Sequence, residues 1–409
     1  MQKVAKMFKS LTKYDVLYII LTFATFILAV VHARTDFIDY NGLYMPFAAN
    51  AYQGNIDLLY RPIPIGNAQG FWFPYIYTWF FAFMMVPFFL LGVVGKYIFA
   101  ALLFYSYYLV INFSYECATR FIPGADSKKK IILSSTILLT LYPYSDVLKN
   151  ANIGIFLVLF SLLAFKLRKS MPLLASVCLF LVFGIKYYGL IILGYFFWLK
   201  EWRVVLYSIL IAIGILFVLP VIAFGYLPTS LMYHDFFIAI NGYGDGWSIY
   251  SIVYPNVVSP ALRFLNYLGI DYSHYRTSAL AILLVCATII MIWFLPSFLR
   301  KKDKITEQYR LRMFLVSLCL CSMLSPISWY NMVLFYTPLV IFGLIDLIIL
   351  KNTYSKIGIT AYLLLFALTT PSFVGNKTND LLEFYAVPFA GLFILFICFV
   401  IRTKKDKLT

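Results

Sequence analysis

Two aspartates, Asp36 and Asp39, stand in the first polar stretch of the chain, directly after an apolar run that begins near Tyr14. Acid groups at a membrane boundary are costly unless they have a task or a partner. If this stretch is helical, their spacing places both carboxylates on one face. A carboxylate there can act as a general base that deprotonates an attacking hydroxyl group. We predict Asp36 as the catalytic base and Asp39 as a substrate-binding residue; the alternative is that both are solvated aspartates past a helix end.

A lysine, Lys186, stands within an apolar stretch and is followed by Tyr187. A buried lysine needs an anion, and the flanking Gly184 and Gly189 allow the backbone to approach a ligand. A phosphate group is a natural partner. The alternative is that Lys186 reaches a lipid headgroup or pairs with a carboxylate of the protein.

Two asparagines, Asn150 and Asn152, precede Gly154 at the start of another apolar segment. Asparagine at a helix start can simply cap the helix. The alternative is that these amides bind the hydroxyl groups of a ligand.

Three further stretches carry polar groups among aromatic residues. His234 and Arg263 lie in the long polar stretch 227–276, which a solvated loop also explains. The segment from Ser325 through Trp329 to Asn331 interrupts two apolar runs. Its proline and serines are typical of a kinked span end, since serine side chains can satisfy backbone groups freed by the kink.

The composition determines the class of protein. Of 409 residues, 63% are hydrophobic and 12% are charged, against roughly 25% charged residues in soluble domains. The chain is therefore a polytopic membrane protein. The net charge of +16 comes mostly from Lys and Arg beside apolar spans, which indicates orientation in a bilayer and argues against a nucleic-acid partner.

Cysteine and histidine usage argues against metal and disulfide chemistry. All six cysteines lie in apolar segments, and the chain has three histidines. Neither a disulfide framework nor a His-rich metal site is expected. We predict no metal ion and no cofactor.

The apolar segments predict an all-α integral membrane protein that forms one polytopic domain over residues 1–409. At ~20 residues per crossing, about twelve segments qualify. They are 14–33, 72–93, 97–119, 131–148, 150–167, 171–199, 204–226, 277–298, 312–328, 332–350, 355–373 and 383–401. The basic N-terminal end is expected in the cytoplasm, which places the loops 34–71 and 227–276 outside.

The middle of this topology contains a conflict. If 171–199 crosses once, the basic clusters at 128–130 and 166–169 fall outside. A break at Lys186 would place both clusters inside, but then 72–93 or 97–119 must fail to cross. Sequence alone leaves both arrangements open.

Several of these pieces, in this order, resemble glycosyltransferase family 87. The similar pieces are Asp36-Phe37 with Tyr40, Gly54, Tyr60 and Pro74; the stretch 150–154; Gly184-Ile-Lys186; and Ser325-Pro326-Ile-Ser328-Trp329. Family members often carry a histidine where this chain has Asn331. Because asparagine carries no positive charge, the resemblance assigns the donor phosphate to Lys186 or Arg263.

The resemblance implies a GT-C-type multi-span helical bundle whose outer loops form the active site. The implied reaction moves a sugar, with mannose favoured, from a polyprenyl-phosphate donor to a glycolipid or glycan hydroxyl, with inversion. Asp36 takes the proton. The implied location is the cell membrane, with many passes. The substrate-binding residues are then Asp39, Tyr40, Tyr60, Asn150, Asn152, Lys186, Tyr187, His234, Arg263, Ser325, Trp329 and Asn331.

Other functions remain open from sequence. A transporter or flippase explains the spans and the broken helix at Lys186, but not an outer loop with two acids straight after the first span. A polymerase or ligase of surface polysaccharide would not depend on Asp36. A scaffold subunit would tolerate the loss of both Asp36 and Lys186.

Overall fold

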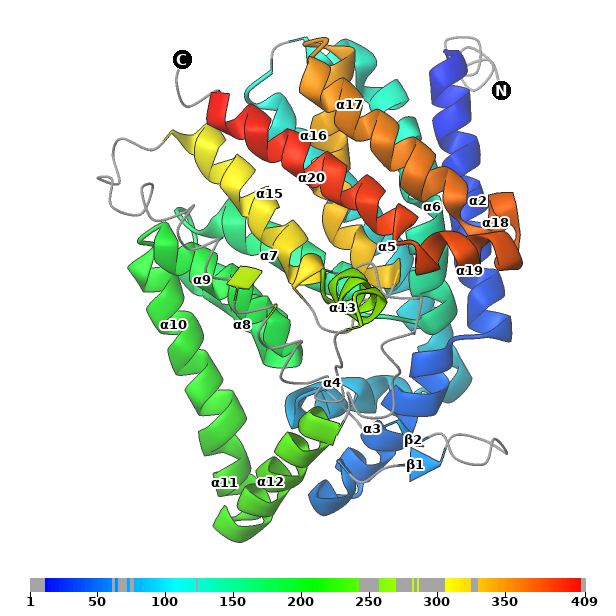
Figure 1. Cartoon of the computed structure of the whole chain (residues 1–409). Helices are drawn as coiled ribbons and strands as arrows, with labels where there is room; N and C mark the ends of the chain where they lie inside the picture. The colour runs from blue at the N-terminus through cyan, green and yellow to red at the C-terminus, as the bar shows by residue number, and fades with distance from the viewer. Residues whose placement is uncertain are drawn as a thin grey trace, which may run out of the picture.

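The computed structural model describes residues 12–60, 63–64, 72–73, 77–122, 124–242, 257–269, 282, 285–286, 306–324 and 330–405. Almost all of this is helix, packed into one bundle (Figure 1). Two short strands, β1 (Ile63–Pro64) and β2 (Trp72–Phe73), pair antiparallel. The predicted all-α membrane fold is confirmed.

The first helix, α2, spans Lys13–Thr35. It begins with a capping box, in which Thr12 and Asp15 satisfy each other's backbone N–H groups, an arrangement that stabilises helix starts. It ends at Asp36, and Phe37 turns the chain with a positive φ of 57°. Three short helices follow: the π-helix η1 (Tyr40–Tyr44), α3 (Met45–Tyr52) and η2 (Ile56–Leu58).

Helix α4 (Trp79–Leu90) is followed at once by α5 (Gly92–Thr119). A Cβ at Gly95 would lie 2.2 Å from the carbonyl oxygen of Phe88, so only glycine permits this close turn. The short η3 (Ala125–Lys128) then leads into α6 (Lys129–Asn150), and α7 spans Gly154–Leu167. In Figure 1, α3 and α4 lie across the lower end of the bundle.

The expected single span 171–199 is two helices, α8 (Pro172–Ile185) and α9 (Leu190–Trp198), separated by Lys186 and η4 (Tyr187–Gly189). Arg168 precedes this pair and Glu201 follows it, yet Arg168 Nε lies 4.0 Å from Glu201 Oε1. The chain therefore leaves one end of the bundle and returns to it. Of the two arrangements that the sequence left open, the structure has the break at Lys186.

Both central basic clusters lie at the end of the bundle where α2 begins. The Lys130 ammonium is 4.2 Å from the ring centroid of Tyr18, near the start of α2. Lys166 Nζ is 3.5 Å from Glu116 Oε2 at the end of α5. We call this the basic end. The positive-inside rule predicts that it faces the cytoplasm, and we call the opposite end the outer end.

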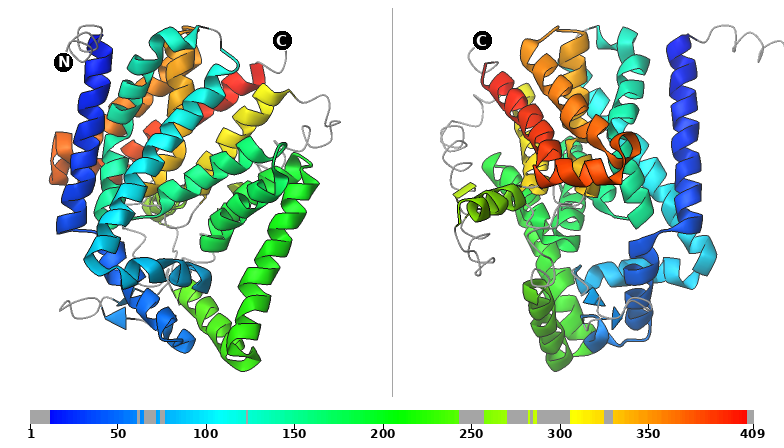
Figure 2. Two further views of the ribbon diagram at one scale, coloured as in Figure 1. Left: turned by 180° about the vertical axis from the view of Figure 1, so that it is seen from behind. Right: turned by 45° about the vertical axis from the view of Figure 1, so that its right-hand side comes forward.

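The second half continues with α10 (Trp202–Ala212), the π-helix η5 (Ile213–Val218) and α11 (Leu219–Phe224). Gly225, with a φ of 87°, turns the chain back into α12 (Tyr226–Gly242). Figure 2 shows these helices as a V whose tip lies at the outer end. Helix α13 (Val258–Tyr267) follows.

The remaining elements complete the bundle. They are α15 (Glu307–Met323), η7 (Tyr330–Tyr336), α16 (Thr337–Ile348), α17 (Thr353–Ala361), η8 (Tyr362–Phe366), η9 (Ala367–Thr369), α18 (Pro371–Val374), α19 (Asn376–Phe384) and α20 (Val387–Lys405).

Within the described residues, 5 helices are long and apolar enough to cross a membrane, or 6 if the bent pair α19–α20 is one span. The five are Lys13–Thr35, Gly92–Thr119, Asp126–Asn150, Trp202–Phe224 and Tyr330–Ile348. Helices α4, α7 and α8 are apolar but shorter. The structure thus supports a membrane protein, while the predicted count of about twelve spans is not confirmed.

Candidate active site

Asp36 ends α2, and its carboxylate is held by neighbours on that helix. Its Oδ2 atom lies 3.0 Å from His32 Nδ1 and accepts a hydrogen bond of 2.9 Å from Thr35 Oγ1. Its backbone carbonyl accepts from Asn41 Nδ2 at 3.0 Å. The side chain remains 36% exposed, so a substrate hydroxyl can reach it.

The charge of Asp36 is stabilised by its surroundings. The hydrogen bond from His32 holds the pKa of Asp36 below its usual range, and Thr35 and Lys149 act in the same direction against partial burial. Asp36 is therefore ionised at neutral pH, as a general base must be.

His32 connects Asp36 to a second helix. Because a carboxylate oxygen can only accept, the Asp36 contact assigns the imidazole proton to Nδ1. The other ring nitrogen, Nε2, lies 3.2 Å from the Oγ of Ser145 on α6. The imidazole thus fixes the Asp36 carboxylate against the outer end of α6.

Asp39 faces the interior and meets side chains from two other elements. Its Oδ2 accepts a 3.4 Å hydrogen bond from Asn152 Nδ2. Burial raises the pKa of Asp39 to about 6, while the charge of Lys186 and hydrogen bonds from Asn152 and Tyr44 oppose that shift. The two aspartates therefore differ in their pKa, which hydrogen bonds lower at Asp36 and burial raises at Asp39.

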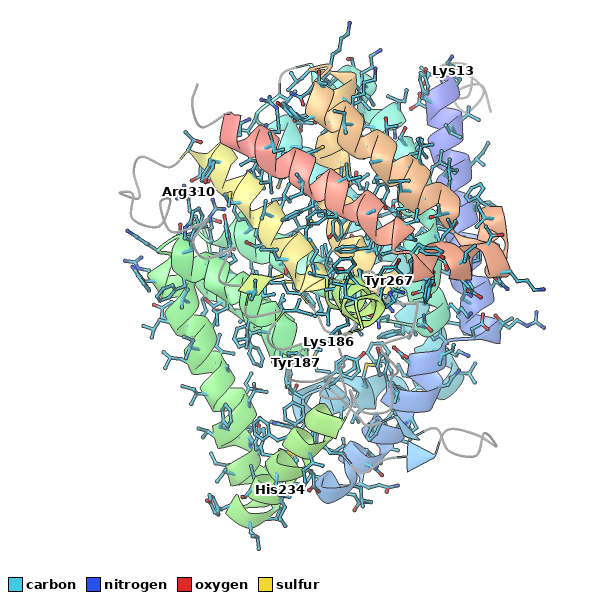
Figure 3. The ribbon with its side chains drawn as sticks, in the orientation of Figure 1. Lys13, Lys186, Tyr187, His234, Tyr267 and Arg310 are labelled. Carbon is cyan, nitrogen blue, oxygen red and sulfur yellow. The ribbon has the colours of Figure 1, made fainter. Side chains whose placement is uncertain are left out.

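Lys186 is buried, with 8% of its surface exposed, at the break between α8 and α9. Its ammonium lies 4.7 Å from the ring centroid of Tyr77 and interacts electrostatically with Asp39. The electrostatic interaction with Asp39 is compatible with pairing to a protein carboxylate, and the role of Lys186 toward a ligand stays a prediction. Figure 3 shows Lys186 and Tyr187 at the end of α8 that faces the outer half of the molecule.

Both asparagines hydrogen-bond to other groups of the protein, and a role in ligand binding stays a prediction. Ala151, with a φ of 53°, ends α6 in the left-handed region. This turn brings Asn152 back toward Asp39, while its Oδ1 accepts from the backbone N–H of Gly154 at 2.9 Å. Asn150 Nδ2 donates to Asp146 Oδ1 at 3.0 Å.

A second polar group lies where α13 meets α19. The Arg263 guanidinium is 5.8 Å from the ring centroid of Phe384 and interacts electrostatically with Glu383. Glu383 Oε1 accepts from Tyr330 Oη and, at 2.7 Å, from Asn379 Nδ2. The Nε and Nη1 atoms of Arg263 are buried, and no described residue hydrogen-bonds to them. Arg263 therefore has donors to offer an anion.

The other predicted site residues have different surroundings. Tyr40 and Tyr60 are buried, and their rings pack against Phe99 and Phe236 respectively. Asn331 is buried, and its backbone lies beside Asp146. His234 is exposed and pairs with Asp235 on α12, well away from Lys186 (Figure 3). Ser325 and Trp329 lie outside the described residues.

The structure adds His32, Asp146 and Glu383, which the sequence reasoning did not select. His32 precedes Asp36 by one helical turn, a spacing at which side chains meet, so that pattern was available. Asp146 and Glu383 stand near other polar residues but in no recognisable motif, and only contacts between helices single them out.

Three carboxylates and three lysines gather around the outer ends of α2, α6 and α8. Lys149 interacts with both Asp36 and Asp146, Lys96 interacts with Asp36, and Lys186 interacts with Asp39. This arrangement can remove a proton at Asp36 and bind a polar ligand next to it. Within the described part of the chain, no group of three His, Cys, Asp or Glu side chains could hold a metal ion.

Comparison with known proteins gives one match. The model of a family described as glycosyltransferase family 87 matches residues 75–326. No curated protein and no solved structure matches the chain. The matched range contains Asn152, Lys186 and Arg263, and it begins after Asp36 and Asp39.

Proposed function

Because the chain belongs to glycosyltransferase family 87, we propose that this membrane glycosyltransferase takes its sugar from a polyprenyl-phosphate donor and passes it, with inversion, to a hydroxyl group of a glycolipid or glycan at the outer face. Mannose is the proposed sugar, and the cell membrane is the proposed location. The transporter left open by the sequence has no comparable support.

The observation that carries the proposal is the setting of Asp36. Its carboxylate is ionised, partly exposed and held by His32 and Thr35 at the outer end of α2. An acceptor hydroxyl that hydrogen-bonds to Asp36 loses its proton to it as the oxygen attacks the anomeric carbon. Base catalysis of this kind contributes typically 10²–10⁴-fold to a rate.

The leaving group is the phosphate of the lipid donor, so the enzyme must stabilise negative charge as the sugar departs. Arg263 suits this role, because its buried Nε and Nη1 atoms have no partner among the described residues. Lys186 interacts electrostatically with Asp39, as Arg263 does with Glu383. We assign the donor phosphate to Arg263 and assign Lys186 to holding Asp39.

The test uses membranes that contain the full-length protein, a lipid extract of the source organism as acceptor, and radiolabelled donors. Polyprenyl-phosphate mannose, polyprenyl-phosphate glucose and nucleotide sugars are compared under identical conditions. The proposal predicts label transfer from a polyprenyl-phosphate sugar and none from a nucleotide sugar in washed membranes. Transfer from a nucleotide sugar alone would contradict the donor class.

A further inference from the structure

One buried carboxylate oxygen near the candidate active site lacks an ordinary hydrogen bond within the described structure. Asp146 lies in the last turns of α6, one position after Ser145. Its Oδ1 accepts the 3.0 Å hydrogen bond from Asn150 Nδ2. Its Oδ2 is buried and makes no hydrogen bond of ordinary geometry to a described residue, while the backbone N–H of Asn331 stabilises the charge of the carboxylate as a whole. Such an oxygen loses its hydrogen bonds to water on burial, which costs free energy unless a ligand replaces them.

The groups around Asp146 explain what it could bind. Asp39 repels its charge, Lys149 attracts it, and the backbone amide of Asn331 lies nearby. Two tyrosine rings, Tyr142 and Tyr330, meet edge to face with centroids 5.2 Å apart, and both interact with Asp146. A carboxylate oxygen beside aromatic rings is suited to a ring with hydroxyl edges and apolar faces.

The charges exclude an anion as the ligand of Asp146. A phosphate would meet the carboxylates of both Asp39 and Asp146, whereas a neutral hydroxyl donates a hydrogen bond to them. The unpartnered donors of Arg263 lie instead beside Glu383. We therefore expect Arg263 to bind the anionic part of a substrate and Asp146 to bind a neutral part.

We propose that Asp146 Oδ2 accepts a hydrogen bond from a ring hydroxyl of a neutral hexose, with Asn150 fixing the carboxylate from the other side. This rests on the proposed function, and it adds a sugar-binding residue to it. The hydroxyl belongs either to the donor sugar or to the acceptor sugar. The chemistry is the same in both cases, and the test separates them.

The first measurement is binding rather than turnover. Purified full-length protein in nanodiscs is titrated with ethyl α-mannoside and its monodeoxy analogues, followed by saturation-transfer NMR, for wild type and Asp146→Asn. We expect one deoxy analogue to bind about tenfold more weakly than the parent to wild type, and that difference to vanish in the variant, since a hydrogen bond to a charged group contributes about 1.5–3 kcal/mol. Asp126→Asn, which makes the same charge change at the basic end of the bundle, should bind like wild type.

The unfolding temperature of the ligand-free protein distinguishes a sugar-binding role of Asp146 from a purely structural role. Asparagine keeps the size of the side chain and its acceptor for Asn150 but removes a buried charge next to Asp39. The ligand-free Asp146→Asn protein should therefore unfold at a higher temperature than wild type, while it binds the sugar more weakly. A lower unfolding temperature with an unchanged preference among deoxy analogues would overturn the proposal.

Turnover then identifies the source of the hydroxyl. Deoxy donors and deoxy acceptors are compared in the transfer assay with both proteins. For each substrate, the transfer rate of the parent compound is compared with that of its deoxy analogue. If Asp146→Asn loses this rate difference for the donor, Asp146 contacts the donor sugar, and if it loses the difference for the acceptor, Asp146 contacts the acceptor sugar. Equal rate differences in both proteins contradict the proposal. If wild type binds the mannoside but transfers nothing, the proposed function fails while the sugar contact stands. Absence of binding overturns the sugar contact itself.

Discussion

His32 Nδ1 and Asp36 Oδ2 are 3.0 Å apart, and the opposite ring nitrogen of His32 lies 3.2 Å from Ser145 Oγ. One imidazole thus links the last turn of α2 to α6 and fixes the proposed base between two helices. A base held in this way keeps one orientation when the acceptor arrives, which reduces the entropy that the reaction must lose.

The first prediction concerns that imidazole. In His32→Asn, the amide nitrogen takes the place of Nδ1 and keeps the hydrogen bond to Asp36, whereas His32→Leu loses both contacts. We expect kcat to fall less than about tenfold in His32→Asn and about ten- to a hundredfold in His32→Leu, given the strength of hydrogen bonds to charged groups. An equal fall of kcat in the two variants would contradict a role of the hydrogen bond from His32 Nδ1 to Asp36. Steady-state transfer kinetics provide the measurement.

The second prediction concerns pH. His32 lowers the pKa of Asp36, so the ionised base persists to lower pH than for a free aspartate. In His32→Leu the pKa of Asp36 rises, and the acid limb of the kcat/KM profile must move to higher pH. The profile of His32→Asn should stay close to that of wild type. A shift of the limb to lower pH in His32→Leu would contradict the assignment.

The third prediction concerns Asp39 and stability. The folded-state pKa of about 6 is above the usual value of 3.8. The folded protein therefore binds this proton more tightly than the unfolded chain, and the contribution of Asp39 to stability falls as pH rises between these values. The unfolding temperature of Asp39→Asn relative to wild type should increase from pH 4 to pH 7, measured in buffered detergent. A decrease over that range would refute the assignment.

The fourth prediction concerns the pairing of Lys186 with Asp39. Lys186→Met removes a positive charge that favours the ionised form of Asp39 and should destabilise the protein, because a buried charge without a compensating charge is costly. Adding Asp39→Asn should restore much of the lost stability. Additive losses in the double variant would show that the two side chains are not coupled.

The fifth prediction concerns Arg263. If it holds the donor phosphate, Arg263→Gln should raise the KM for the donor and lower kcat while leaving the KM for the acceptor unchanged. Arg263→Lys keeps the charge but not the planar set of donors, so it should recover only part of the activity. A change confined to the KM for the acceptor would contradict this assignment and indicate that Arg263 binds the acceptor.

The fold class followed from the sequence because apolar segments separated by basic clusters are a direct consequence of the bilayer. Asp36 and Asp39 were located correctly at the end of the first span. The break at Lys186 was one of two alternatives, and the contact between Arg168 and Glu201 decides it. That contact joins distant parts of the chain, so no local pattern could reveal it.

The candidate site was less predictable. Asp146 and Glu383 are singled out only by contacts between helices, because polar residues near them in the sequence give no sign of which side chain faces the site. His234 looked similar to the other candidates in sequence, but it is exposed on α12 and paired with Asp235. Tyr40 and Tyr60 are packed inside the protein, because an aromatic side chain near a polar loop serves the core as readily as a ligand.

The central claim is that Asp36 is the catalytic base. Wild type, Asp36→Asn and the control Asp126→Asn are expressed to equal levels in membranes, and transfer from radiolabelled polyprenyl-phosphate mannose to the lipid extract is followed by thin-layer chromatography. We predict that Asp36→Asn loses transfer by about a hundredfold or more, while Asp126→Asn matches wild type. Equal transfer by wild type and Asp36→Asn would contradict the claim.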